Sequence, residues 1–259
     1  MNIVVCVKQT PDTAATVTVE GGQISWGDAP LVLNPWDEYA VEEALRTKEA
    51  HGGKVTAVSL GPESAKEALK QALAMGCDEA ILLSDGAWAQ ADSLVTARIL
   101  SAAIRKTESP ELVLFGKATV DSAAGVTFAQ TARLLGWPLL SLVAKIETMD
   151  PEGRSVTAER MVSEGRQVVK SGLPAVISVV KEINEPRYPS FMGIRKASKA
   201  EIPVWGAGEL EVGSAESRVV WAEILAPPKV DTACEIIEGE TPEAQAAKLA
   251  ERLIEEKVI

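Results

Sequence analysis

Residues 55–84 read VTAVSLGPESAKEALKQALAMGCDEAILLS, and this stretch decides the predicted fold class. An apolar, β-branched run ends at Gly61-Pro62, a helical pattern then reaches Met75 and stops at Gly76, and a second apolar run follows at 80–84. Short apolar runs of this kind are typical of strands buried on both faces. A helix that connects two such strands indicates a parallel sheet covered by helices.

The same alternation continues on both sides of this unit. Asn34 is placed as an N-cap, with Pro35 in the first helical position and Asp37 facing the exposed amides, while Ser64 and Glu67 have the spacing of a capping box. The expected strands are 3–7, 55–59, 80–84 and 112–115, and the expected helices are 36–50, 64–75, 126–135 and one that starts at residue 92 or 93. We therefore predict an α/β, Rossmann-like parallel sheet with helices on both faces.

The pattern changes after the fourth of these helices. An added antiparallel region is predicted from strands at 139–147, 155–162 and 166–171, and a small hairpin at 16–25. After Lys199 we expect a loop at 205–208 and a lone strand at 219–225. A final helix over 244–257 is predicted to be capped by Thr241, with Pro242 in its first position. The sequence thus predicts an α/β domain over 1–200 and a C-terminal arm ending in a helix over 201–259.

Composition limits the possible functions. Of the 259 residues 46% are apolar, and the formal charge of −11 argues against sequence-independent binding to nucleic acid, which needs a basic face. No apolar run reaches the about 20 residues that span a bilayer, and the N-terminus carries no visible secretory signal. Three scattered cysteines and one histidine predict a reduced, cytoplasmic protein without a zinc site.

Groupings of catalytic residues are missing from the sequence. His51 stands beside Gly52-Gly53, where an interaction at a helix end explains it more simply than catalysis does. Glu42-Glu43 are expected on a solvated helix face, and Cys6 is expected to be a small core residue. We therefore expect a protein without catalytic residues of its own.

The loop after the strand at 112–115 is the most informative candidate for ligand binding. Residues 116–125 read GKATVDSAAG, which places small residues and one acid between a strand and a helix start. Backbone amides at 123–127 would approach a phosphate closely there. A tight turn that needs small residues explains the same sequence. The P-loop pattern and the dinucleotide fingerprint are both absent.

A second candidate is a locally basic segment after the apolar strand at 175–180. Residues 184–199 read NEPRYPSFMGIRKASK, with four basic residues and no acid after Pro186. Pro186 and Pro189 oppose regular structure, so we expect an irregular loop with Phe191 and Met192 near its middle. Such a loop suits contact with another macromolecule. A solvated loop whose Phe191 folds back onto its own core is the alternative.

These residues resemble a known family. The segment 184–190 with Gly193-Ile194 and the basic run 195–199 resembles the electron transfer flavoprotein beta subunit. Further stretches agree in order: 4–9 with Pro11-Asp12, Asn34-Pro35 with 40–45, Gly61-Pro62 and 72–76. The resemblance covers the chain from the first strand to about Gly208, and the tail is similar to the family's C-terminal arm.

The resemblance implies an adenine-nucleotide-hydrolase-like fold and a non-catalytic subunit of a heterodimer. The beta subunit of that family holds AMP, while the redox FAD belongs mainly to the alpha subunit, on which the C-terminal arm packs. The heterodimer takes electrons from acyl-CoA or other flavin dehydrogenases and passes them to a quinone oxidoreductase or another acceptor. By resemblance, the nucleotide site comprises Cys6, Asn34, Pro35, Trp36, Asp37, Leu60, Gly116, Lys117, Ala118, Thr119, Val120, Asp121, Ser122, Ala123, Ala124, Gly125, Val126 and Thr127.

The segment 183–199 matches the family's recognition loop, which inserts an apolar residue into a partner dehydrogenase. That residue is commonly leucine, and Phe191 takes its place here. The docking residues implied are Pro186, Arg187, Tyr188, Phe191, Met192, Ile194, Arg195, Lys196 and Lys199.

The loop after Gly116 departs from the family pattern. Asp121 is followed by small residues where common members carry a second acid and a polar run. AMP, a second FAD as in electron-bifurcating relatives, and an empty site stay open as alternatives, and we favour AMP. A homodimeric nucleotide-binding protein of the universal-stress type shares the α/β layout, but it leaves the segment after Asn184 and the long arm unexplained.

Overall fold

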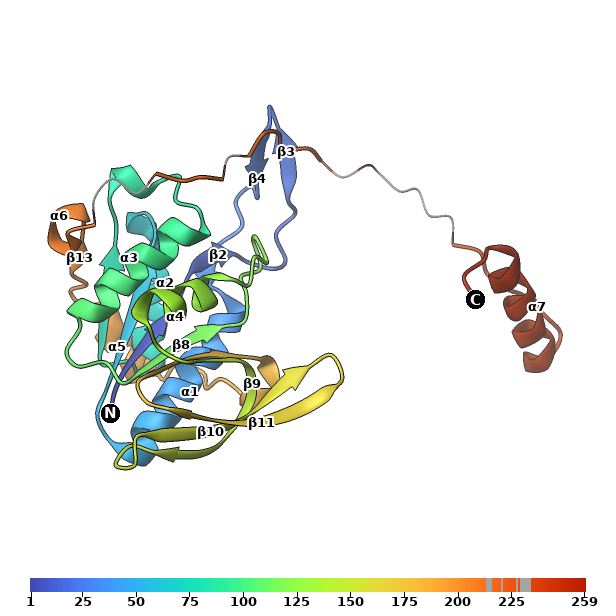
Figure 1. Ribbon diagram of the computed structural model, residues 1–259. Helices are drawn as coiled ribbons and strands as arrows, with labels where there is room; N and C mark the ends of the chain where they lie inside the picture. The colour runs from blue at the N-terminus through green and yellow to red at the C-terminus, as the bar shows by residue number, and fades with distance from the viewer. Residues whose placement is uncertain (213–215, 220, 227, 229–233) are drawn as a thin grey trace. The chain divides into compact units, whose positions relative to one another are not determined.

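The computed structural model describes residues 1–212, 216–219, 221–226, 228 and 234–259. They form two units, Met1–Ile224 and Leu225–Ile259, which are described separately. The first unit contains a large sheet and the helices that cover it (Figure 1).

The large sheet confirms the predicted α/β architecture. Its strand order is β11-β10-β9-β12-β8-β1-β6-β7-β13, and within the described residues every neighbouring pair from β9 to β13 is parallel. β10 and β11 add the antiparallel extension. The strand bounds are β1 Asn2–Cys6, β6 Lys54–Leu60, β7 Glu79–Leu83, β8 Leu112–Gly116, β9 Leu139–Asp150, β10 Ser155–Val162, β11 Gly165–Gly172, β12 Ala175–Val179 and β13 Val204–Trp205.

Helices cover both faces of this sheet because its central strands are apolar on both sides. Val5 of β1 packs in the core under α1 (Pro35–His51) and α2 (Lys66–Met75), while Val4 packs in the core under α3 (Ser93–Lys106) and α4 (Thr127–Leu135). Successive side chains of a strand point to opposite faces, so one apolar run contributes to both cores. Figure 1 shows α3 and α4 side by side on their face of the sheet.

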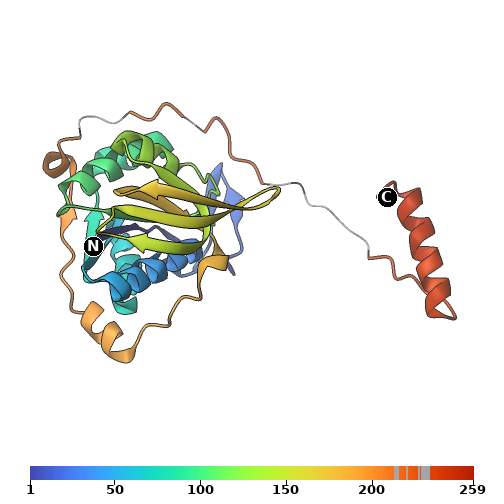
Figure 2. The same cartoon turned by 60° about the horizontal axis from the view of Figure 1, so that its bottom comes forward.

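Smaller elements surround the sheet. β2 (Gln9–Pro11) pairs with β5 (Leu31–Leu33), and β3 (Thr18–Glu20) forms the predicted hairpin with β4 (Gln23–Ser25). The short helix α5 (Phe191–Ala197) packs against α2, and Figure 2 shows it in orange at the lower left. In the second unit, α7 (Pro242–Glu255) begins as predicted, with Thr241 Oγ1 accepting a hydrogen bond from the amide of Ala244 at 3.2 Å.

Two predictions near helix starts are wrong. The capping box at Ser64 does not form, because Ser64 Oγ donates instead to Gln9 Oε1 at 3.0 Å and a single 3₁₀ turn, Glu63–Ala65, precedes α2. The expected irregular loop after Pro189 contains the helix α5, because Ser190 Oγ accepts a hydrogen bond from the amide of Gly193 at 2.9 Å and caps it.

Two predictions for residues 205–225 also fail. The expected loop at 205–208 includes Trp205 of β13, which pairs with β7, and the start of α6 (Ala207–Leu210). Asp85 Oδ2 accepts a hydrogen bond from the amide of Ala207 at 3.0 Å and holds this turn beside the sheet. The lone strand expected at 219–225 is not formed by residues 219 and 221–225, and residue 220 lies outside the described residues.

None of the helices within the described residues combines the length and the apolar character that crossing a membrane would require.

Candidate functional site

The candidate site lies where the order of the parallel strands reverses. The chain runs from β1 outward to β6 and β7, and then returns to β8 on the other side of β1. In sheets of this type, ligands bind in the crevice beyond the carboxyl ends of the strands at this reversal. Cys6 and Gly116 end the two strands that flank it, and Leu60 ends the neighbouring β6.

Asp37 joins the two strand ends. Its carboxylate is buried and accepts a hydrogen bond from the amide of Lys8 at 2.8 Å, directly after β1. The backbone of Gly116 lies against the same carboxylate, and a Cβ atom added there would stand 2.5 Å from Asp37 Oδ1 and 2.6 Å from Trp36 O. The prediction that Asp37 faces the exposed amides of its own helix is therefore wrong, because its carboxylate bonds the backbone of other elements.

Asn34 holds the loop after β8. It occupies the N-cap position of α1 as predicted, but its side chain makes no cap bond within the described residues. Instead, Nδ2 donates to Ala118 O at 2.9 Å and Oδ1 accepts from the amide of Val120 at 3.2 Å. Because Asn34 is fully buried, these bonds fix one part of the loop against the start of α1.

The rest of the loop combines charged groups with an uncapped helix end. Lys8 Nζ pairs with Asp121 Oδ2, and Lys117 Nζ stands 4.0 Å from the centroid of the Trp36 ring. α4 begins at Thr127, and within the described part of the chain no side chain caps its first amides. Free amides and the helix dipole at such an end favour an anion.

Burial raises the pKa of two groups at this site, Asp37 and Cys6. It raises the pKa of Asp37 to about 7, although hydrogen bonds from the backbone of Lys8 and from Asn34 oppose the rise. Burial also raises the pKa of the Cys6 thiol far above its ordinary value. Cys6 is buried and is a core residue, as predicted.

The second predicted site lies on exposed residues of α5 and the segment before it. Phe191 is 80% exposed and Tyr188 is 96% exposed, so the interpretation in which Phe191 folds back onto the core is wrong. Met192, Ile194, Arg195, Lys196 and Lys199 are exposed as well, whereas Pro186 and Arg187 are half-buried. The exposed apolar residues stand together with basic residues on one short helix.

The prediction that Glu42-Glu43 form a solvated face is wrong. Both are buried, at 2% and 9% exposure, because the segment after β12 covers them. Asn184 Nδ2 donates to Glu43 Oε2 at 3.0 Å and to Tyr39 O at 3.1 Å, and Arg187 binds Glu42. No local signal links positions more than 140 residues apart; the only hint was that the glutamates stand between Val41 and Ala44 in an apolar run.

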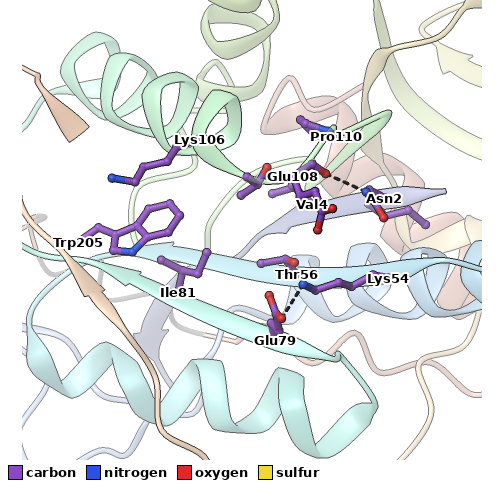
Figure 3. A pocket seen from close by; sticks show the side chains of 12 residues that line it. Asn2, Val4, Lys54, Thr56, Glu79, Ile81, Lys106, Glu108, Pro110 and Trp205 are labelled. Atoms are coloured by element: carbon purple, nitrogen blue, oxygen red, sulfur yellow. Dashed lines mark hydrogen bonds and ion pairs between the residues drawn. The ribbon is translucent and has the colours of Figure 1, made fainter. Parts of the chain in front are cut away.

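A small cavity lies at the opposite end of the sheet (Figure 3). It holds about 180 Å³ between the starts of β1, β6 and β7, with Lys106 facing the ring of Trp205 at one side. Typical ligand sites measure roughly 300–1,000 Å³. This cavity is therefore too small for a nucleotide and shares no residue with the strand-end site.

The fold places this chain in the α/β class, with a mainly parallel sheet covered by helices on both faces. Residues 26–210 match the model of the electron transfer flavoprotein domain. The chain is 38% identical over 275 aligned positions to the electron transfer flavoprotein subunit beta of Thermoanaerobacterium thermosaccharolyticum, and 36% identical over 263 positions to that of Bacillus subtilis, with both chains covered completely in each case. It is also 37% identical to the FixA protein of Azorhizobium caulinodans, over 82% of this chain and 77% of that protein.

The chain belongs to the electron transfer flavoprotein family, as a beta subunit, and its function is electron transfer. The resemblance seen in the sequence is confirmed, and the universal-stress type is not retained.

We expect Gly116→Ala to destabilise the protein because its methyl group would overlap the carboxylate of Asp37 and the carbonyl of Trp36. Overpacking of this kind costs about 1–3 kcal/mol. Chemical denaturation measures the change in the free energy of unfolding. Gly86→Ala is the matched control, since a Cβ there meets nothing within 4 Å, and it should change stability by less than about 0.5 kcal/mol. Equal stabilities of the two variants would contradict the close approach at Gly116.

We also expect Asp37 to titrate near neutral pH. Its folded pKa of about 7 lies above the ordinary 3.8, so the folded chain binds more protons between these values. The contribution of Asp37 to the free energy of unfolding therefore decreases as pH rises from about 4 to about 7 and is constant above. The ¹³C chemical shift of its carboxyl carbon, assigned with Asp37→Asn, reports the midpoint. A midpoint near 4 would contradict the burial argument.

Proposed function

We propose that this chain is the nucleotide-holding and docking subunit of a heterodimer with an electron transfer flavoprotein alpha subunit. The observation that carries the proposal is the spatial separation of two built regions, a strand-end site around Asn34, Asp37 and Gly116, and an exposed apolar helix at Phe191. In this proposal the first region is structural and the second makes transient contact with redox enzymes. A cytoplasmic location stays a prediction.

AMP is the ligand that we propose for the strand-end site. The amides at the start of α4 suit its phosphate, and the small side chains at 122–125 leave backbone groups to make most of the contacts. Asn34 and Asp37 would keep the loop and strand ends in place around it. AMP contributes no redox chemistry, and the electron-carrying flavin is an FAD held mainly by the alpha subunit.

The helix α5 is proposed to dock acyl-CoA or other flavin dehydrogenases. Phe191 with Met192 and Ile194 presents an apolar contact beside Arg195 and Lys196, on a chain of net charge −11. A few exposed apolar anchors dominate the free energy of binding in most interfaces. A small contact also suits a carrier that must leave its partner quickly to reach an acceptor such as a quinone oxidoreductase.

Co-expression with the candidate alpha subunit tests the first region. The purified heterodimer should be yellow, and denaturation should release AMP and FAD in about equal amounts, measured by chromatography against standards. The electron-bifurcating alternative predicts about two FAD and no AMP for each heterodimer. Release of FAD alone, in a single equivalent, would contradict nucleotide binding by this chain.

Phe191→Ala tests the second region. Loss of the anchor should weaken coupling to the dehydrogenase by about 1 to 4 kcal/mol, seen as a rise in the KM for the heterodimer. The FAD content should not change. Val168→Ala removes another exposed apolar side chain, 63% exposed, from β11 and serves as the control. The docking role fails if both variants couple as the unaltered heterodimer does.

A further inference from the structure

The segment that leads into α5 is attached to α1 by one arginine. Arg187 Nε donates to Glu42 Oε2 at 2.7 Å and Nη2 donates to Glu42 Oε1 at 3.1 Å. Nη1 and Nη2 donate to the two carboxylate oxygens of Glu49 at 2.5 and 3.1 Å. The backbone amide of Arg187 also donates to Glu42 Oε2, at 3.2 Å. One guanidinium therefore forms two-pronged bonds with two carboxylates of the same helix.

Burial makes this contact more than an exposed ion pair. The side chain of Glu42 is only 3% exposed, and a buried carboxylate without partners would be strongly unfavourable. Burial alone raises the pKa of Glu42, and the hydrogen bonds from Arg187 and Arg46 overcome this effect and lower it. Glu42 therefore stays ionised, and Arg187 is held wherever α1 places that carboxylate.

A separate contact fixes the helix itself. Gly193 lies so close to α2 that a Cβ atom would stand 2.3 Å from Ala74 O, and Ala197 is buried. Tyr188 and Phe191 lie between Arg187 and this second contact, and their side chains extend into solvent. The exposed residues are thus carried on a short segment fixed at both ends.

We propose that Arg187 is a positioning residue for docking: by binding Glu42 and Glu49 of α1 it sets the direction in which Tyr188 and Phe191 face a partner. This inference rests on the proposed docking role of α5. It also revises the role expected for Arg187, whose guanidinium contacts its own chain rather than the partner. Lysine cannot replace it, since a single ammonium does not bind two carboxylates in two-pronged fashion.

The test compares Arg187→Lys, Phe191→Ala and the double variant in the complete heterodimer. Electron transfer is measured from a flavin dehydrogenase chosen because it reduces the unaltered heterodimer. Arg187→Lys should raise the KM for the heterodimer about tenfold, in the range of coupled contacts, with kcat and FAD content unchanged. In the Phe191→Ala background, Arg187→Lys should raise the KM by less than about a further twofold, because the side chain that Arg187 positions is already absent.

Arg46→Lys is the matched control. Arg46 Nε also donates to Glu42, at 2.8 Å, but it belongs to α1 and not to the docking segment. Arg46→Lys should leave the KM within about twofold of the value for the unaltered heterodimer. An equal rise in KM for Arg46→Lys and Arg187→Lys would assign the effect to the stability of α1 and overturn the proposal.

The outcomes separate this inference from the proposed function. If Phe191→Ala has no effect, the docking role itself fails. If Phe191→Ala raises the KM while Arg187→Lys leaves it unchanged or adds its full effect in the double variant, the docking role stands and the positioning role fails. Should Arg187→Lys not fold, Glu49→Gln tests the positioning role instead. It removes one of the two carboxylates that Arg187 binds, at an exposed position, and should raise the KM about threefold.

Discussion

Three carboxylates buried on one helix constrain the rest of the structure. Asp37, Glu42 and Glu43 of α1 are all shielded from water, and each would be unfavourable without hydrogen-bond donors. Each receives a hydrogen bond from another segment: the amide of Lys8 for Asp37, Arg187 for Glu42 and Asn184 for Glu43. Arg46 of α1 itself adds one further hydrogen bond to Glu42. The hydrogen bonds that these buried carboxylates accept therefore fix both the end of β1 and the chain after β12.

This constraint places both of the proposed functional regions on one helix, α1. The amino end of α1 and the residue before it hold the strand ends and the loop after β8, through Asp37 and Asn34. Its middle and carboxyl half hold the proposed docking segment, through Glu42 and Glu49. The strand-end site and the proposed docking helix are thus both attached to α1. A fixed geometry of this kind suits a carrier, because docking then costs little ordering of the chain.

Much of the fold was predictable because its signals are local. Apolar runs identified the central strands, Thr241 was recognised as a cap, and the start of α3 was placed at residue 92 or 93. The predictions fail where a partner that is distant in the sequence determines the local structure. Ser64 bonds Gln9 instead of its own helix, and Trp205 becomes a strand because the edge of β7 is open to it. Glu42 looked solvated because its partner Arg187 lies 145 positions away.

The same reasoning separates the two halves of the candidate site. Gly116 and the loop after it were predictable, because a strand followed by small residues and a helix start is a local pattern. The role of Asn34 was not, since its capping position is visible in sequence whereas its bonds to Ala118 and Val120 depend on how α1 meets β8. The docking segment shows the reverse case. Its apolar residues beside basic ones were evident from the sequence, whereas the exposure of Phe191 was decided only by the structure. The bonds of Arg187 to Glu42 and Glu49 also became visible only when the fold brought these residues together.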